Sequence, residues 1–146
     1  MGIASKAGLV CAGALILGAA AVRGAVKPAA KNQPNVEALL NTQTTVLDQP
    51  IAYPTQDAAR ITAVIVTLAP GEETGRHRHP VPLYGQVLSG QVTIDYDGHG
   101  SKTFQAGDAF MEAVGTWHNG RNSGDEPLRI LAVFLGAEGI ANSERP

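Results

Sequence analysis

The sequence offers almost no sulfur from which covalent cross-links could form. Only one of its 146 residues is a cysteine, Cys11, and it lies in an apolar N-terminal stretch. Disulfide bonds and thiol chemistry are therefore excluded from residues 26–146, whatever the redox state of the compartment. Packing alone, or packing helped by a metal ion or a partner subunit, must hold this part of the chain together.

The sequence also lacks a block of basic residues. Its 11 lysines and arginines stand against 13 aspartates and glutamates, and the formal net charge is −2. Nucleic acids are bound mainly through clustered lysine and arginine, so we expect no nucleic acid partner. After residue 25 no segment shows sustained helical periodicity, which argues against a helical domain.

The N-terminal 25 residues have the pattern of an export signal. One lysine, Lys6, precedes an apolar run over residues 7–22, and small residues follow. This order is typical of a secretory signal peptide, with cleavage near residues 19–21 or near residues 22–24. The alternative is an uncleaved membrane anchor, although a span usually needs ~20 apolar residues. The pattern predicts a periplasmic or secreted protein, or one anchored to the membrane by this segment alone.

The rest of the chain fits one domain with a single core. Residues 26–43 contain two prolines and several amides and are typical of a linker. Residues 44–136 form the expected domain, and residues 137–146 form a short polar tail.

Short β-branched or alternating stretches recur in this domain every eight to twelve residues, with turn signals between them. This spacing predicts an all-β sandwich or barrel. Residues 61–68 are apolar on both faces, so we expect that strand between two layers, and we expect a polar loop over residues 121–127. The expected strands cover residues 44–47, 61–68, 83–88, 91–96, 102–105, 109–114 and 128–135.

Three histidines fall in two glycine-bounded stretches, residues 71–90 and 107–122. His77 and His79 are two residues apart, so in an extended strand they share a face about 6.6 Å apart. His118 lies in the second stretch. The three imidazoles are candidate ligands for one metal ion, whereas the alternative for the first pair is a solvated basic turn.

The spacing of these residues resembles the cupin superfamily. The first stretch, Gly71-(five residues)-His77-Arg78-His79-(three residues)-Leu83-(six residues)-Gly90, is similar to the first cupin motif. The second, Gly107-(five residues)-Ala113-Val114-Gly115-Thr116-Trp117-His118-(three residues)-Asn122, is similar to the second cupin motif. The resemblance covers about residues 44–136. It implies a small jelly-roll-like barrel of antiparallel strands that holds a metal ion in its mouth.

Two positions depart from the family pattern. Leu83 stands where the first motif normally has a glutamate, the usual fourth metal ligand, and Ala113 stands where the second has a proline. The histidines His77, His79 and His118 remain as a possible site for a divalent ion with open positions. By resemblance, iron or manganese is favoured, and nickel or zinc is possible.

Other candidate residues surround this centre. Glu112 is the best replacement for the missing carboxylate, as a ligand or as a general base; the alternative is a carboxylate behind the ligands or at the rim. Counting by twos from His79 places Leu83 and Val87 inside the barrel, where they would shape a pocket. Trp117 would line the same pocket or pack in the core.

The sequence therefore leaves two main hypotheses for function. The first is a metal-dependent enzyme that acts on a small molecule, with oxygenase, isomerase or lyase chemistry. The second is a barrel that binds a small molecule or a metal without turnover, and a metal-free structural barrel is a third possibility. A homodimer is expected by resemblance, formed through sheet edges or through exchange of residues 44–53.

Overall fold

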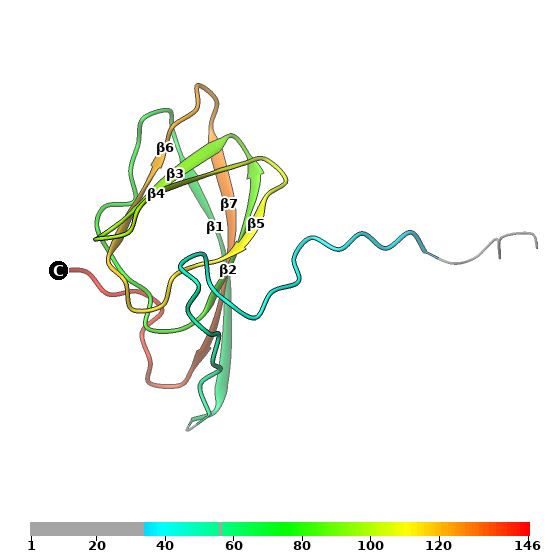
Figure 1. Ribbon diagram of the computed structural model, residues 1–146, viewed down its shortest axis with the longest axis vertical. Helices are drawn as coiled ribbons and strands as arrows, with labels where there is room; N and C mark the ends of the chain where they lie inside the picture. Colours follow the sequence, from blue (N-terminus) through cyan, green and yellow to red (C-terminus); the bar gives the residue numbers. More distant parts are fainter. Residues whose placement is uncertain (1–33, 56) are drawn as a thin grey trace, which may run out of the picture. The chain divides into compact units, whose positions relative to one another are not determined.

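The computed structural model describes residues 34–55 and 57–146. The expected signal segment and most of the linker lie outside the described residues. Clustering of contacts separates residues 1–35 from residues 36–146, and all named elements belong to the second unit (Figure 1). Within the described residues, no helix has the length and apolarity needed to cross a membrane.

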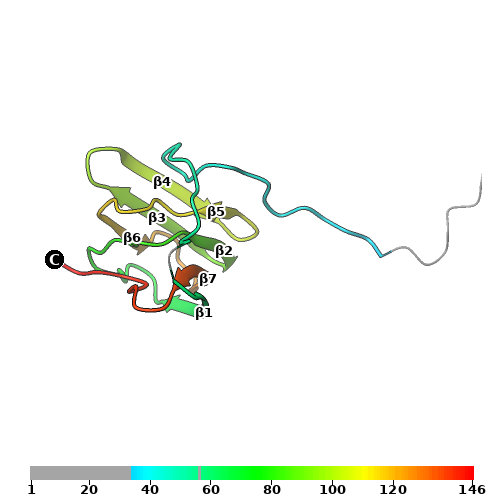
Figure 2. The same cartoon turned by 90° about the horizontal axis from the view of Figure 1, so that it is seen from below.

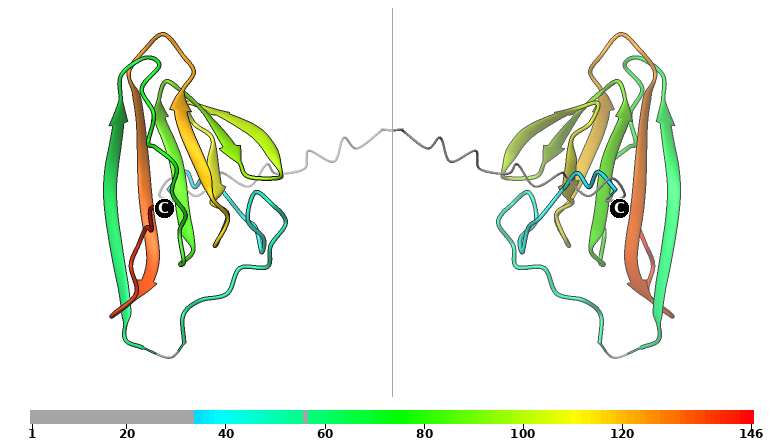
Figure 3. Two further views of the ribbon diagram at one scale, coloured as in Figure 1. Left: turned by 90° about the vertical axis from the view of Figure 1, so that its left-hand side faces the viewer. Right: turned by 90° about the vertical axis from the view of Figure 1, so that its right-hand side faces the viewer.

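Seven antiparallel strands form two sheets in this unit. The strands are β1 (Ala59–Leu68), β2 (Leu83–Ser89), β3 (Gln91–Tyr96), β4 (Gly100–Gln105), β5 (Ala109–Met111), β6 (His118–Asn122) and β7 (Leu128–Ala137). One sheet has the order β1-β7-β2-β5, and the other has the order β4-β3-β6. Figures 2 and 3 show the two sheets as separate layers. The expected all-β architecture of antiparallel strands is confirmed.

The core lies between the two sheets because each sheet turns alternate residues inward. Leu83, Gly85 and Val87 of β2 are all buried, as counting by twos from His79 predicts. Val92 and Ile94 of β3 belong to the same buried cluster as Val87. Burial of apolar surface contributes roughly 25 cal/mol per Å² to folding. The cluster therefore holds the sheets face to face beneath the histidines.

Strand β1 does not lie between two layers, as its composition predicted. It is the edge strand of the four-stranded sheet and pairs only with β7. Ile61 and Ile65 keep 61% and 46% of their surface exposed. An apolar, β-branched sequence indicates that a strand forms, but it does not report what covers each face.

Two further segments differ from the prediction. Residues 44–47 form no strand; Thr44 makes a single bridge to Pro50 across a turn in which Asp48 has a positive φ of 60°. The sequence predicts a loop over residues 121–127, but the first two of these residues belong to strand β6. This strand is polar and contains a glycine, so its composition gives little strand signal. It forms because β3 offers it a partner, with Tyr96 opposite His118 and Val92 opposite Asn122.

Candidate metal centre

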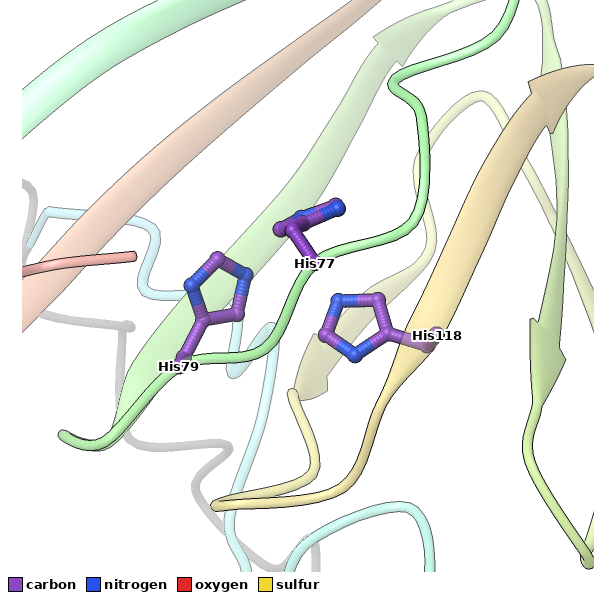
Figure 4. A group of neighbouring side chains, drawn as sticks. All are labelled: His77, His79 and His118. Carbon is purple, nitrogen blue, oxygen red and sulfur yellow. The ribbon is translucent and has the colours of Figure 1, made fainter. Parts of the chain in front are cut away.

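Backbone hydrogen bonds bring the two histidine stretches together. The amide of His77 donates to the carbonyl of His118 at 2.9 Å, and the amide of His118 donates back to the carbonyl of His77 at 2.8 Å. The amide of Gly115, three residues before His118, donates to the carbonyl of His79 at 2.8 Å. The segment before β2 is therefore joined to the start of β6, and the three side chains point toward one another (Figure 4).

The three imidazoles form a compact group. One ring nitrogen from each histidine lies within 4.8 Å of the others, and the ring centroids are 4.4–5.0 Å apart. Two nitrogen ligands at the usual bond length of roughly 2.0–2.1 Å lie at most about 4.2 Å apart. The separation of at most 4.8 Å is close to this limit, so the donor set fits a divalent metal.

Each histidine donates its Nδ1 proton to a backbone carbonyl. The acceptors are Gly75 for His77 at 2.7 Å, Asn142 for His79 at 2.9 Å, and Thr116 for His118 at 2.9 Å. A carbonyl only accepts, so Nδ1 must carry the proton, and in a neutral ring the lone pair is then on Nε2. Metal-binding histidines are fixed in this way. The shared tautomer makes all three Nε2 atoms available as ligands.

Burial keeps the three rings neutral. It lowers the pKa of His77 and His118 below 6.5, and it lowers the pKa of His79 to about 3. The backbone hydrogen bonds act in the opposite direction but are the smaller effect for all three. A metal ion needs neutral imidazoles. The site therefore has to release almost no protons from its ligands at neutral pH when it takes up an ion.

Glu112 lies directly opposite Leu83, the residue that replaces the usual glutamate. The amide of Glu112 donates to the carbonyl of Leu83 at 2.8 Å, and opposed residues of an antiparallel pair face the same way. A buried carboxylate therefore faces the same side as Leu83 but comes from the residue that follows β5. Only 4% of Glu112 is exposed, and burial raises the pKa of its carboxyl.

The two oxygens of Glu112 have different surroundings. Oε1 accepts hydrogen bonds from the Tyr96 hydroxyl at 2.6 Å and from the Ala113 amide at 2.8 Å. Oε2 lies 4.0 Å from Nε2 of His118. Burial and the neighbouring carboxylate raise the pKa of Tyr96, so its hydroxyl remains a donor. Glu112 is thus held by one oxygen and presents the other to the histidines.

The histidines lie in the wall of a cavity of about 360 Å³. Both sheets supply an apolar lining, which consists of Val66, Leu68, Leu83, Val92, Ile94, Phe110, Ile130, Ala132 and Phe134. Glu112 adds a carboxyl to this wall. The exposed residues Glu73 and Arg145 mark the side that opens to solvent. Such a cavity suits a small molecule with an anchored polar end.

Two predicted pocket residues lie outside this lining. Val87 is 1% exposed and packs in the core, beyond Gly85 and the ring of Phe110 that lies over it. Trp117 precedes His118 and therefore turns to the opposite face of the chain. Its ring lies between the guanidinium groups of Arg76 and Arg78, 4.7 and 4.8 Å from its centroid.

The sequence interpretation missed three contributors. Tyr96 could have been found, since it follows Val92 and Ile94 on the inward face of β3. Asn142 and Arg145 were assigned to a plain polar tail. Their contacts join residues more than sixty positions apart in the chain, so no local pattern indicates them.

These features together define a small all-β domain with a cluster of three histidines. Residues 64–134 match the family model described as a cupin domain. That stretch contains the three histidines and Glu112, and the match supports a place for the chain in this superfamily. No curated protein matches the sequence at a significant level.

Several solved structures of oxalate decarboxylases have a similar fold. A variant from Bacillus subtilis has 29% identity over 57% of this chain and 23% of its own, with a TM-score of 0.51. A formate complex from Lactobacillus farciminis has 29% identity over 57% of this chain and 26% of its own, also with a TM-score of 0.51. The matched part is thus about a quarter of either enzyme.

Proposed function

We propose that this protein is a metal-dependent cupin enzyme that acts on a small molecule. His77, His79 and His118 hold a divalent ion, with iron or manganese favoured over nickel or zinc. The observation that supports this most directly is the shared tautomer, which leaves the Nε2 lone pair of each clustered histidine available to a metal ion. A bound ion would supply Lewis acidity or a site for dioxygen. The reaction class is that of an oxygenase, an isomerase or a lyase.

The substrate class that fits the cavity is a small carboxylate. Three neutral imidazoles do not compensate the charge of a divalent ion, and the Glu112 carboxylate can offset only part of it, which favours a further anion. Arg145 lies in the cavity wall, and no carboxylate among the described residues pairs with it. The oxalate decarboxylases that share the fold are named for a small dicarboxylate, and one was solved with formate.

The Arg145 guanidinium provides a direct test of this substrate class. We expect Arg145→Gln to weaken oxalate binding about tenfold, since hydrogen bonds between charged groups are the strong ones. Oxamide has the same shape without charge, and its affinity should not change. Calorimetric titration of the metal-loaded protein measures both. Equal losses for the two ligands would contradict a role for Arg145 in anion recognition.

Glu112 is the group we assign to proton transfer. Its Oε2 faces the histidines, while Tyr96 and Ala113 fix its other oxygen. Burial favours the protonated carboxyl, and a bound cation favours the carboxylate. A carboxyl under these two opposed influences suits a group that takes up and returns a proton.

The second candidate function is binding without turnover. It is favoured by Leu83, because the carboxylate ligand that resemblance leads one to expect is absent from β2. In that case the barrel would hold a small molecule or a metal ion, and Glu112 would only stabilise the charge of the bound ion. Turnover measurements on the metal-loaded protein separate this function from the first.

Metal content is the experiment that tests the centre itself. Protein exported without a tag should carry close to one equivalent of a divalent ion. The double variant His77→Ala/His118→Ala should lose it, whereas His99→Ala, on an exposed turn, should keep it. Iron or manganese would direct the search to oxidative or isomerase activity, and zinc or nickel to lyase, hydrolytic or binding roles. An ion-free native protein would refute the centre.

Export and dimer formation are also part of the proposal. Removal of the signal over residues 1–25 gives a mature periplasmic or secreted protein, and an intact mass equal to that of the full chain would exclude cleavage. For the dimer, β1 is a better candidate than residues 44–53. Val46 donates its amide to Met111 of the same chain, so that segment is already docked. In contrast, no strand among the described residues pairs with the outer edge of β1, which also carries exposed apolar side chains.

A further inference from the structure

The C-terminal residues 142–145, here called the strap, lie along the segment that carries two of the histidines. The Glu144 amide donates to the Arg78 carbonyl at 2.9 Å, and the Arg78 amide donates to the Glu144 carbonyl at 3.1 Å. The two side chains also form an ion pair at 2.7 Å. The strap is therefore paired, like a short antiparallel strand, with the residue between His77 and His79.

The strap makes the only long-range contact among the three that fix the histidine tautomers. Gly75 and Thr116 each lie two residues from the histidine that they orient. Asn142 instead reaches His79 across 63 positions of the chain, and Ser143 Oγ lies 3.0 Å from the same Nδ1. His77 and His118 are oriented by their own turns, whereas His79 is oriented by a separate segment.

This contact decides how well His79 can serve as a ligand. The ring is 5% exposed, and its Nδ1 proton needs an acceptor there because an unpaired buried donor is costly. If the strap leaves, Nδ1 meets water, and the ring is free to rotate or change tautomer. Loss of such an orienting partner typically lowers metal affinity 10–100-fold.

We propose that the strap supports the metal centre, so that docking of the strap against residues 77–79 and binding of the ion favour each other. The inference rests on the proposed role of His79 as a ligand. Linkage requires reciprocity: the strap raises metal affinity by the same factor by which the ion favours the seated strap. The strap also carries Arg145, whose guanidinium donates to the Thr74 carbonyl at 3.2 Å, so the seated strap adds a positive group to the cavity wall.

Two substitutions of Glu144 form a matched pair for the test. Glu144→Pro removes the amide that donates to Arg78, and Glu144→Ala removes only the ion pair. Titration with Co²⁺, followed by visible absorption, gives the affinity of each full-length variant. We expect a 10–100-fold loss for Glu144→Pro and a change below about threefold for Glu144→Ala. A chain ending at Ala141 should behave like the proline variant and serves if that variant does not fold.

Hydrogen exchange tests the reciprocal effect. Addition of Co²⁺ to the native chain should slow exchange of the Glu144 amide, while amides of the β3–β4 turn serve as the control. If the strap only supports the fold, Glu144→Pro would lower the melting temperature of the metal-free protein but leave Co²⁺ affinity unchanged. Co²⁺ would then not slow exchange of the Glu144 amide in the native chain.

Three outcomes are decisive. A large loss of affinity in the proline variant, with metal-dependent protection of Glu144 in the native chain, supports the strap. If the native chain binds Co²⁺ tightly and the proline and truncated variants bind it equally well, the proposed role of the strap is overturned but the metal centre is retained. A native chain that binds no Co²⁺ overturns both proposals.

Discussion

At the scale of single residues, Glu112 has the most direct functional consequence. Glu112→Gln keeps the size of the side chain and an oxygen that can accept from Tyr96. We expect the variant to bind its metal ion, and to lose turnover of its substrate by roughly 10²-fold or more, as removal of a proton-transfer group does. Metal analysis together with steady-state rates checks this. Unchanged turnover would remove Glu112 from the chemistry.

The buried ring of His79 makes acid sensitivity a second test at this scale. Its pKa is about 3 in the folded protein and 6.5 as a model group, so the unfolded chain takes up the proton first as the pH falls. The contribution of this ring to stability is therefore present above pH 6.5 and is lost toward pH 3. The loss between pH 6.5 and pH 5 is about 1.5 kcal/mol.

Urea unfolding of the metal-free protein at several pH values measures this effect. The His79→Gln variant has no titrating ring, so its free energy of unfolding should fall by about 1.5 kcal/mol less between pH 6.5 and pH 5. Parallel curves for the two proteins would mean that His79 is solvated and titrates normally.

The residues of the site differ in how far the sequence could predict them. The three histidines follow from fixed offsets within two short stretches, whereas Glu112 was only the best candidate because it precedes His118 on the same segment; the structure places all four in one cavity wall. Trp117 was ambiguous because a single aromatic residue next to a ligand can face either way. The Asn142 carbonyl could not be predicted, since it is a backbone atom and its position depends on the path of the whole tail.

At the scale of elements, the pairing of β2 with β5 leaves no room for a side chain at Gly85. A Cβ atom on Gly85 would lie 2.6 Å from the Phe110 ring, whereas one on Gly120 of β6 would lie no closer than 3.5 Å to any atom. Gly85→Ala should therefore destabilise the protein by about 1–3 kcal/mol through overpacking. Gly120→Ala should cost less, and thermal unfolding compares the two. The order of these costs would reverse if β2 moved away from Phe110 without resistance.

Prediction of the elements succeeded where alternation is strong and failed where it is weak. Strand β3 alternates apolar and polar residues, and its predicted bounds are those of the structure. Strand β6 is polar, and only the open edge of β3 makes it a strand. Strand formation there depends on tertiary context, which composition does not contain.

At the scale of the whole molecule, the exposed apolar side chains of β1 bear on assembly. Ile61, Val64 and Ile65 keep 61%, 40% and 46% of their surface exposed on a strand with one free edge. Such edges pair with another chain unless they are blocked. We expect a homodimer through β1, and Ile65→Lys should convert it to a monomer. Light scattering at micromolar concentration measures the mass, with Thr103→Lys on β4 as the control; a native monomer would refute the dimer.

The backbone pairing of His77 with His118 has a consequence for how new chemistry could arise on this fold. The pairing uses only amide and carbonyl groups, so it does not depend on which side chains stand at those two positions. Replacement of one ligand therefore leaves its neighbours aimed at the same point. Single ligands can therefore be substituted while the backbone arrangement of the site is kept, so a variant that takes a different ion or catalyses a different reaction does not require a new barrel.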